Sequence, residues 1–398
     1  MPQTRERDPQ PRFPGERCGR INFMNSYDAV VAGGGVIGAS IAFELATEGL
    51  SVAVFDAQQP GREASWASAG MISPAPESSA MASLLPISMA SVRLYPEFLQ
   101  RVEEVSGKTV GYRKDGALDI LLNGTGQSEI DEILALHRDA GLRAEVLSGP
   151  EAREIEPTLT SELRAAIHRP DEASLDNRRL TEATLEAARR RGAEIFAGNG
   201  AKALWTEGNA CKGLHLESGR VEARWTVIAA GCFSTRIEGV AAYAPVTPAK
   251  GQMIALRCDS VNLKKDLWSG HMYLVPRHDG RIIAGSTVEY EGFDRSVTAA
   301  GMKKILTSVI ALVPALESAR IEETWAGLRP DTPDHLPILG PTDRNGLLIA
   351  TGHFRSGILL TPVTARLIRE WVTTQNVTED WAPFSPMRFQ QAHHTRSA

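Results

Sequence analysis

The first patterned part of the chain alternates between two hydrophobic spacings. Residues 27–32 form a short apolar run rich in β-branched side chains, residues 36–48 have apolar positions at helical spacing, and residues 50–55 are apolar again. The pattern predicts a strand, a helix and a second strand, a βαβ unit of about 30 residues. Because so short a crossover joins parallel strands, we expect a right-handed, doubly wound sheet covered by helices on both faces.

The remaining pattern predicts more helices and a second sheet. Helices are expected at residues 84–105, 127–139, 177–191 and 357–372, after a small-residue loop at 60–76. Short strands are expected at 110–112, 117–122, 193–196, 203–206, 212–216, 221–229 and 346–351. Strand patterns at 245–256, 272–275, 281–284 and 321–328 favour a large antiparallel sheet. The fold class expected is therefore α/β and α+β combined.

Length and composition narrow the class of protein. The chain has 398 residues, more than the ~250 to 300 residues at which a single hydrophobic core stops growing, so two domains are expected. The net charge is 43 − 48 = −5 with scattered basic residues, so we expect a small-molecule partner and no nucleic acid. The longest apolar run, 29–43, falls short of the ~18 residues of a membrane helix, so no membrane association is expected. Residues 1–25 are expected to be a disordered extension.

Cysteine usage points to a reducing compartment. The four cysteines stand far apart without a C-x-x-C pair, which disfavours both a disulfide framework and a metal site. We therefore expect a cytoplasmic protein with no metal.

A glycine-rich turn between the first strand and helix indicates nucleotide binding. Gly33, Gly35 and Gly38 form G-x-G-x-x-G, in which the glycines allow a tight turn, close approach of pyrophosphate, and packing of helix on strand. Asp56 ends the second strand near the ~20-residue spacing at which an acid meets the adenosine ribose. This pattern leaves FAD and NAD as alternatives.

Three further segments combine small residues with turns. They are residues 64–72 (ASWASAGMI), 225–234 (WTVIAAGCFS, with Gly231) and 352–360 (GHFRSGILL). Each permits close approach of the backbone to a ligand, and together they suggest an elongated cofactor.

At these motifs the chain resembles the D-amino-acid oxidase superfamily of FAD-dependent amine oxidases, and most closely the glycine oxidases that feed thiamine biosynthesis. The resemblance runs from about residue 27 to 389 and includes YDAVVAGGGVIG, ASWASAGM, residues 171–180, VIAAG, HMYLVPR, WAGLRPDTPDHLPILG and GHFRSGILLTP. It implies FAD bound without a covalent link, in a GR2-type, Rossmann-like domain of residues 26–110, 170–240 and 330–389. It also implies a substrate domain of residues 111–169 and 241–329, built on an antiparallel sheet.

The resemblance also assigns cofactor contacts. The residues implied are Gly33, Gly35, Val36, Ile37, Gly38, Asp56, Ala57, Ala64, Ser65, Ala69, Gly70, Met71, Ala201, Gly231, His353, Phe354, Arg355, Ser356, Gly357, Ile358 and Leu359. The family pattern usually has two small or hydroxyl residues where this chain has Ala64 and Ser65, and a small residue where it has Trp66. These departures concern the side chains of the loop and leave its backbone role intact.

Four residues are implied in substrate binding. Arg329, in G-L-R-P, is placed to grip a carboxylate through two parallel charge-assisted hydrogen bonds. Tyr273 is implied to reach the same carboxylate, although a core tyrosine is the alternative. Arg355 is expected to add a second positive charge beside the flavin, or else to be an ordinary arginine at a helix start. His271 either lines the pocket or is structural.

The activity implied is oxidative deamination of glycine, sarcosine or small D-amino acids by hydride transfer to flavin N5. The products would be the imino acid, then the keto acid and ammonia, with molecular oxygen reduced to hydrogen peroxide, for thiamine thiazole synthesis. Alternatives are a D-amino-acid dehydrogenase, a sarcosine or proline oxidase, a noncatalytic FAD-binding subunit, or an NAD-dependent dehydrogenase. A homo-oligomer is expected from the family.

Overall fold

The computed structural model describes residues 26–75, 79–124 and 126–390, so the expected disordered extension lies outside the described residues. The helices are α1 (Val36–Thr47), α2 (Ala64–Ala67), α3 (Leu85–Ser106), α4 (Gln127–Asp139), α5 (Gly149–Ile155), α6 (Asn177–Arg190), α7 (Ala299–Leu312) and α8 (Thr361–Thr374). The strands are β1 (Ser26–Ala32), β2 (Val52–Phe55), β3 (Met71–Ile72), β4 (Ala117–Leu122), β5 (Glu145–Ser148), β6 (Leu163–Arg169), β7 (Ala173–Ser174), β8 (Glu194–Phe196), β9 (Ala201–Glu207), β10 (Ala210–Leu216), β11 (Gly219–Ile228), β12 (Thr247–Arg257), β13 (Asp266–Ser269), β14 (Met272–Pro276), β15 (Ile282–Gly285), β16 (Arg320–Asp331), β17 (Ile338–Pro341) and β18 (Leu347–Thr351).

The first sheet is built on the predicted βαβ unit. Its order is β17-β18-β11-β1-β2-β8, with β10 paired to β11 and β9 to β10. The strands from β18 to β8 run parallel. Alternate residues of β1 face opposite sides: Ala29 and Val31 pack among α1, α3, α6 and α8, whereas Val30 and Ala32 pack with β10 and β11. Both faces are buried, as expected for a doubly wound sheet.

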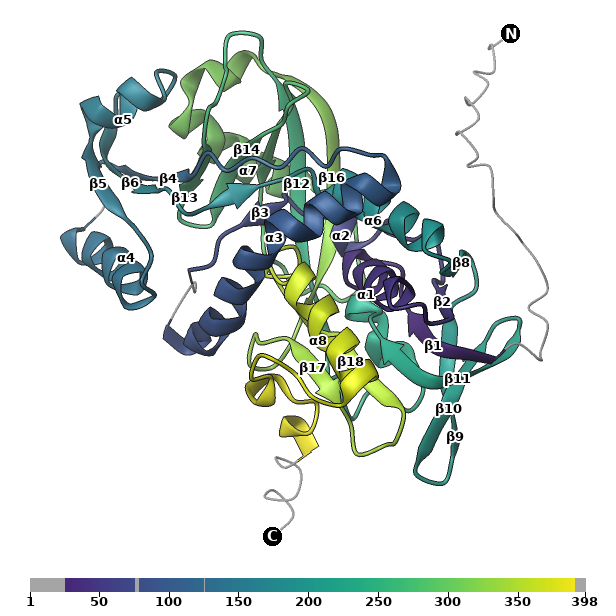
Figure 1. Ribbon diagram of the computed structural model, residues 1–398. Coiled ribbons are helices and arrows are strands. Elements are labelled where there is room, and N and C mark those ends of the chain that lie inside the picture. Colours follow the sequence, from purple (N-terminus) through teal and green to yellow (C-terminus); the bar gives the residue numbers. More distant parts are fainter. Residues whose placement is uncertain (1–25, 76–78, 125, 391–398) are drawn as a thin grey trace, which may run out of the picture.

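The second sheet has the order β16-β12-β15-β14-β13-β4-β6-β5 and is antiparallel except where β13 meets β4. Its two faces have different neighbours. Ile254, Leu274 and Ile282 face α7, while Met253 and Tyr273, one residue away on their strands, face α2. Figure 1 shows this sheet in the upper part of the molecule and the first sheet in the lower right part. The predicted α/β and antiparallel architecture is therefore confirmed.

Two expected elements differ from the structure. The helix expected from residue 357 begins at Thr361, because residues 357–360 form a turn instead of the first helical turn. Pro362 then occupies the first turn, where its missing N–H is not needed. The strand expected at 110–112 does not form, because Gly111 has φ of 77°, outside the β region.

Several elements were not predicted. They include α5, α7, β5, β6, β13 and β17. Helix α7 has an N-cap that the sequence shows only as a threonine: Gly301 N–H donates to Thr298 Oγ1 at 3.1 Å.

The strands of each sheet come from separated parts of the chain. Those of the first sheet lie in residues 26–55, 194–228 and 338–351, and those of the second in 117–169 and 247–331. We therefore propose the discontinuous domains of residues 26–110, 170–240 and 330–389, and of 111–169 and 241–329. Within the described ranges, no helix is both long enough and apolar enough to cross a membrane.

Candidate functional site

A cavity of about 770 Å³ lies between the two sheets. Its lining includes the carboxyl ends of β1 and β2 and residues on the α2-facing side of the second sheet. In open α/β sheets, the carboxyl ends of the strands are where ligands bind. The predicted residues in the lining are Gly33, Gly35, Val36, Ile37, Asp56, Ala57, Ala64, Ser65, Ala69, Gly70, Met71, Ala201, Gly231, His271, Tyr273, Arg329, His353, Phe354, Arg355, Ser356, Gly357, Ile358 and Leu359. The predicted residue Gly38 does not line this cavity.

The three glycines of the motif have different surroundings. A Cβ on Gly38 would lie 2.0 Å from the carbonyl oxygen of Gly33, and one on Gly33 would lie 2.5 Å from the carbonyl oxygen of Ala229. These two glycines are required by packing of the backbone. A Cβ on Gly35 would have Ser65 Oγ as its nearest neighbour, at 3.1 Å, and Gly35 lines the cavity. Gly35 therefore keeps space open for a ligand.

The amino end of α1 opens into this cavity. Its first residues, Val36 and Ile37, are in the lining, and the first turn contains no acidic side chain. The positive end of the helix dipole and its N–H groups suit a phosphate. The Asp56 carboxylate at the end of β2 accepts hydrogen bonds from Gly34 N–H at 2.8 Å and Gln58 N–H at 2.9 Å. Asp56 is thus fixed at the edge of the same space.

Trp66, the departure from the family pattern, packs outside the cavity. The guanidinium of Arg178 lies 3.5 Å from the Trp66 ring centroid and 4.7 Å from that of Trp325. Trp325 also donates its indole N–H to the carbonyl oxygen of Ala67 at 3.0 Å. The large side chain therefore anchors α2 against β16, while the cavity wall is left to the small residues of α2.

Arg329 extends from β16 into the cavity. Its Nη2 donates to Ser286 Oγ at 2.6 Å and its Nη1 to the Thr287 carbonyl oxygen at 3.2 Å. The guanidinium lies over Gly251, where a Cβ would come within 2.4 Å of it. A glycine is therefore needed for this arginine position. Sequence analysis did not identify Gly251, because its partner lies on another strand.

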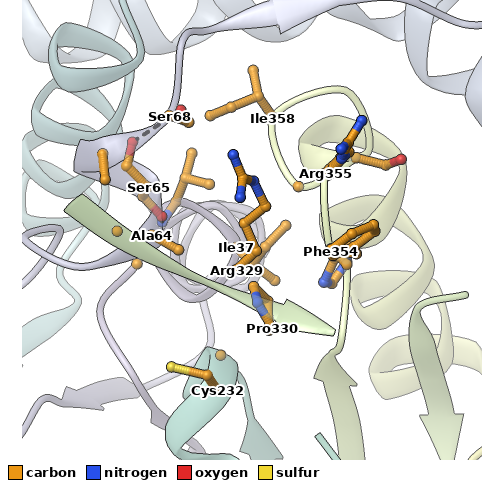
Figure 2. Close-up of a pocket in the computed structure, with 18 of the residues that line it drawn as sticks. Ile37, Ala64, Ser65, Ser68, Cys232, Arg329, Pro330, Phe354, Arg355 and Ile358 are labelled. Atoms are coloured by element: carbon orange, nitrogen blue, oxygen red, sulfur yellow. Dashed lines mark hydrogen bonds between the residues drawn. The ribbon is translucent and has the colours of Figure 1, made fainter. Parts of the chain in front are cut away.

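The cavity contains a second arginine. Figure 2 shows the Arg329 guanidinium pointing between Ser65 of α2 on one side and the turn that carries Arg355 and Ile358 on the other. Arg355 stacks near the Phe354 ring, with Cζ 5.5 Å from its centroid. Two guanidinium groups bordering one space make it suited to an anionic ligand.

Tyr273 and His271 also line the cavity. Tyr273 is buried, and its hydroxyl donates to Met253 Sδ at 3.2 Å. A thioether is a weak acceptor, so a carboxylate would be a better partner for this hydroxyl. His271 is exposed and lies in the turn before β14.

His353 is buried in the turn before α8, and its Nε2 lies 3.1 Å from Thr364 Oγ1 of that helix. Burial lowers the pKa of its imidazole to about 3. The ring is therefore neutral in the folded protein at neutral pH, and it contributes packing and hydrogen bonding rather than charge.

This shift predicts acid sensitivity of the fold. The unfolded chain protonates His353 near pH 6.5, whereas the folded chain does so only near pH 3. Its contribution to stability is therefore complete above pH 6.5 and is lost as the pH falls from 6.5 toward 3, at roughly 1.4 kcal/mol per pH unit. Urea unfolding between pH 7.5 and 4.5 should show a shallower decline for His353→Gln than for the wild type. Equal slopes would contradict this assignment.

Sequence analysis missed several polar residues of the lining. They are Glu63, Asp119, His137, Arg169, Ser286 and others. Burial raises the pKa of the Glu63 carboxyl, which pairs with Arg295 at 2.7 Å. Arg169 ends β6, a strand that the sequence pattern did not reveal. No signal in one sequence would have placed these residues together, because they come from separate strands and loops.

The site combines the glycine-rich turn after β1, the amino end of α1 and a sheet that carries Arg329. This combination is typical of a dinucleotide-binding oxidoreductase. Residues 28–371 match the model of the family described as FAD dependent oxidoreductase, and the chain belongs to this family. FAD is therefore its cofactor and the protein is an FAD-dependent oxidoreductase enzyme. The residues present fit this group, because Gly35 and the small residues of α2 leave space beside the helix end.

The comparisons also identify individual relatives. The chain is 33% identical over 369 residues to glycine oxidase of Geobacillus kaustophilus, covering 91% of this chain and 97% of that protein. It is 33% identical over 372 residues to the bifunctional protein ThiO/ThiG of Trichormus variabilis, covering 92% of this chain and 56% of that protein. The chain thus spans about half the length of that bifunctional relative. The crystal structure of the Geobacillus kaustophilus glycine oxidase superposes with a TM-score of 0.85 and 32% identity, covering 91% of this chain and 99% of that one.

Proposed function

We propose that the protein oxidises glycine and other small amino acids, including sarcosine and small D-amino acids, and supplies thiamine thiazole synthesis. The observation that carries this proposal is Arg329, held over Gly251 in the cavity that also receives α1 and α2. The similarity to glycine oxidases and to a ThiO/ThiG protein supports the choice of substrate and pathway.

The carboxylate of the substrate would be held by Arg329. Its guanidinium is held by Ser286 and Thr287, and a guanidinium is a planar donor group whose geometry matches a carboxylate. Tyr273 would exchange its weak Met253 partner for the same carboxylate. Holding the carboxylate at two points fixes the direction of the Cα–H bond.

Gly35, the small residues of α2 and the turn before α8 would hold FAD, which would supply the acceptor for a hydride from Cα and, in an oxidase, the route of the electrons to oxygen. The amine would lose its ammonium proton before this step, and the imino acid released would hydrolyse in water to the keto acid and ammonia. Arg355 adds positive charge to the cavity and would stabilise negative charge that develops on the cofactor. The residues of the chain therefore orient the substrate and set the local charge.

We propose that FAD is held without a covalent link. Among the described residues that line the cavity, Cys232 is a cysteine. Burial raises the pKa of its thiol to about 12, so it is protonated at neutral pH and is a poor nucleophile. A cytoplasmic location and a homo-oligomeric state remain predictions.

Hydrogen peroxide release across a panel of glycine, sarcosine, D-alanine and L-proline tests the function. We expect glycine and sarcosine to be oxidised with peroxide formed in equal amount to keto acid. Running the same panel with an artificial electron acceptor under nitrogen separates an oxidase from a dehydrogenase. Turnover that requires the artificial acceptor, or that is confined to L-proline, would overturn the proposal.

A further inference from the structure

Arg329 reaches its hydrogen-bond partners across a neighbouring strand. On β16, Arg329 stands opposite Ala249 of β12. Ser286 and Thr287, which accept its hydrogen bonds, follow β15 on the other side of β12. The guanidinium crosses β12 at Gly251, where a side chain would block it. The position of the guanidinium therefore depends on where the chain after β15 lies relative to β12.

The chain after β15 has little regular structure to hold it there. Residues 286–298, all of them described by the structure, join β15 to α7 without forming a helix or a strand of the sheets. We call residues 286–298 the connecting segment. Its backbone meets β12 at an isolated bridge, in which Lys250 and Glu289 exchange N–H···O hydrogen bonds of 2.8 and 3.0 Å. Two such bonds give limited support to a segment of this length, so side chains must supply more.

Lys250 joins the connecting segment to β12 through its side chain. The residue is fully buried, and its ammonium group contacts the carboxylates of Glu289 at 2.9 Å, of Asp294 at 3.0 Å and of Glu291. All three carboxylates belong to the connecting segment. The Glu291 and Asp294 side chains are 53% and 45% exposed, so water can solvate them if the ammonium group is removed. Without the ammonium group, the three carboxylates would repel one another and the segment would lose this link to β12.

Lys250 acts from the face of the sheet opposite the cavity. Successive residues of a strand face opposite sides, and Gly251 faces Arg329. Lys250 and Gln252 therefore face away from the cavity, and neither is among the described residues that line it. The backbone N–H of Gln252 donates to Thr287 Oγ1 at 2.9 Å. The connecting segment thus links the reverse face of β12 to the residues that hold Arg329.

We propose that Lys250 is a positioning residue for substrate binding: its ammonium group fixes the connecting segment, so that the Arg329 guanidinium stays aligned for a carboxylate. The inference rests on the proposed function, because it takes Arg329 as the carboxylate site. A paired contact between guanidinium and carboxylate depends on alignment, and misplacement by about 1 Å can cost a hundredfold in rate. A lysine outside the cavity therefore controls the affinity for the substrate.

Lys250→Met tests this role in the flavin-containing protein. We expect the KM for glycine and the dissociation constant for acetate to rise about tenfold, while kcat and flavin content stay close to those of the wild type. Acetate is the probe because it presents a carboxylate alone, and its binding is followed through the flavin absorbance. Lys108→Met removes the lysine of another ion pair, with Glu182 at 2.8 Å and outside the cavity lining, and should leave both constants unchanged. Unchanged constants in Lys250→Met would overturn the proposal.

A double-mutant cycle separates positioning from a general structural effect. If Lys250 acts through Arg329, adding Lys250→Met to Arg329→Ala should raise the KM no further, because the group that Lys250 aligns is gone. A further rise of about tenfold would show an independent effect of Lys250 and would overturn the proposal.

A second variant covers the case in which Lys250→Met does not fold. Glu291→Gln combined with Asp294→Asn keeps the lysine and removes two of its partners, which are about half exposed. The KM for glycine and the dissociation constant for acetate should then rise about threefold. Wild-type values of both constants in this variant would speak against any role of the ion pairs in substrate binding, and the proposal would fall.

The outcomes also separate this inference from the proposed function. A raised KM in Arg329→Ala with a wild-type KM in Lys250→Met overturns the inference and leaves the proposed function standing. Weaker acetate binding in Lys250→Met, in a protein that oxidises no amino acid, supports the positioning role and overturns the proposed function.

Discussion

Replacement of Arg329 by alanine is expected to raise the KM for glycine by about 100-fold while the purified protein stays yellow. Each hydrogen bond to a charged group contributes about 1.5 to 3 kcal/mol, and each 1.4 kcal/mol corresponds to a factor of ten. The flavin should be retained, because Arg329 stands on the second sheet, apart from the glycine turn and the amino end of α1. The measurements are steady-state kinetics with glycine and the flavin absorbance of the same preparation.

Two further variants sharpen this prediction. Arg320→Ala removes an exposed arginine from the other end of β16, and its KM should equal that of the wild type. Gly251→Ala places a methyl group within 2.4 Å of the Arg329 guanidinium and should raise the KM without removing any charge. An unchanged KM in Arg329→Ala would remove this residue from the substrate site, whatever the other variants show.

The cofactor side of the cavity could be predicted from sequence because its signals are local. Gly33, Gly35 and Gly38 share one turn, and the spacing of apolar residues around them predicts the strand and helix that this turn connects. The structure places that turn at the carboxyl end of β1, as the pattern requires. Residue spacing is sufficient to predict a binding site where one short segment forms both the secondary structure and the contacts to the ligand.

The substrate side could be predicted only in part, because its geometry depends on pairing between distant strands. Arg329 and Tyr273 were identified through family motifs, whereas Gly251 is opposite Gly327 through the register of β12 and β16. Asp119 and Trp268 become neighbours through pairing of β4 with β13, which are separated by over a hundred residues. Strand pattern reveals a strand but not its partner, so the distal end of the cavity was not foreseen.

Gly35→Val and Gly38→Val are expected to fail in different ways, although both glycines belong to one motif. A side chain at Gly38 meets the Gly33 carbonyl oxygen at 2.0 Å, a backbone atom that cannot move without displacing α1 from β1. Gly38→Val should therefore be poorly expressed or unfolded. A side chain at Gly35 first meets the Ser65 hydroxyl, at 3.1 Å, and otherwise extends into the cavity.

Gly35→Val should accordingly fold but lose its yellow colour. Filling the space beside the helix end costs about 1 to 3 kcal/mol of binding, which weakens FAD affinity by about tenfold to 100-fold. Circular dichroism should show a folded protein, and added FAD should raise its melting temperature less than it raises that of the flavin-free wild type, since a ligand stabilises only the state that binds it. Full flavin content in Gly35→Val would mean that phosphate does not approach this turn. Unfolding of Gly35→Val to the extent seen for Gly38→Val would mean that both glycines serve packing alone, and the position of FAD would then have to be carried by α2 and the turn before α8.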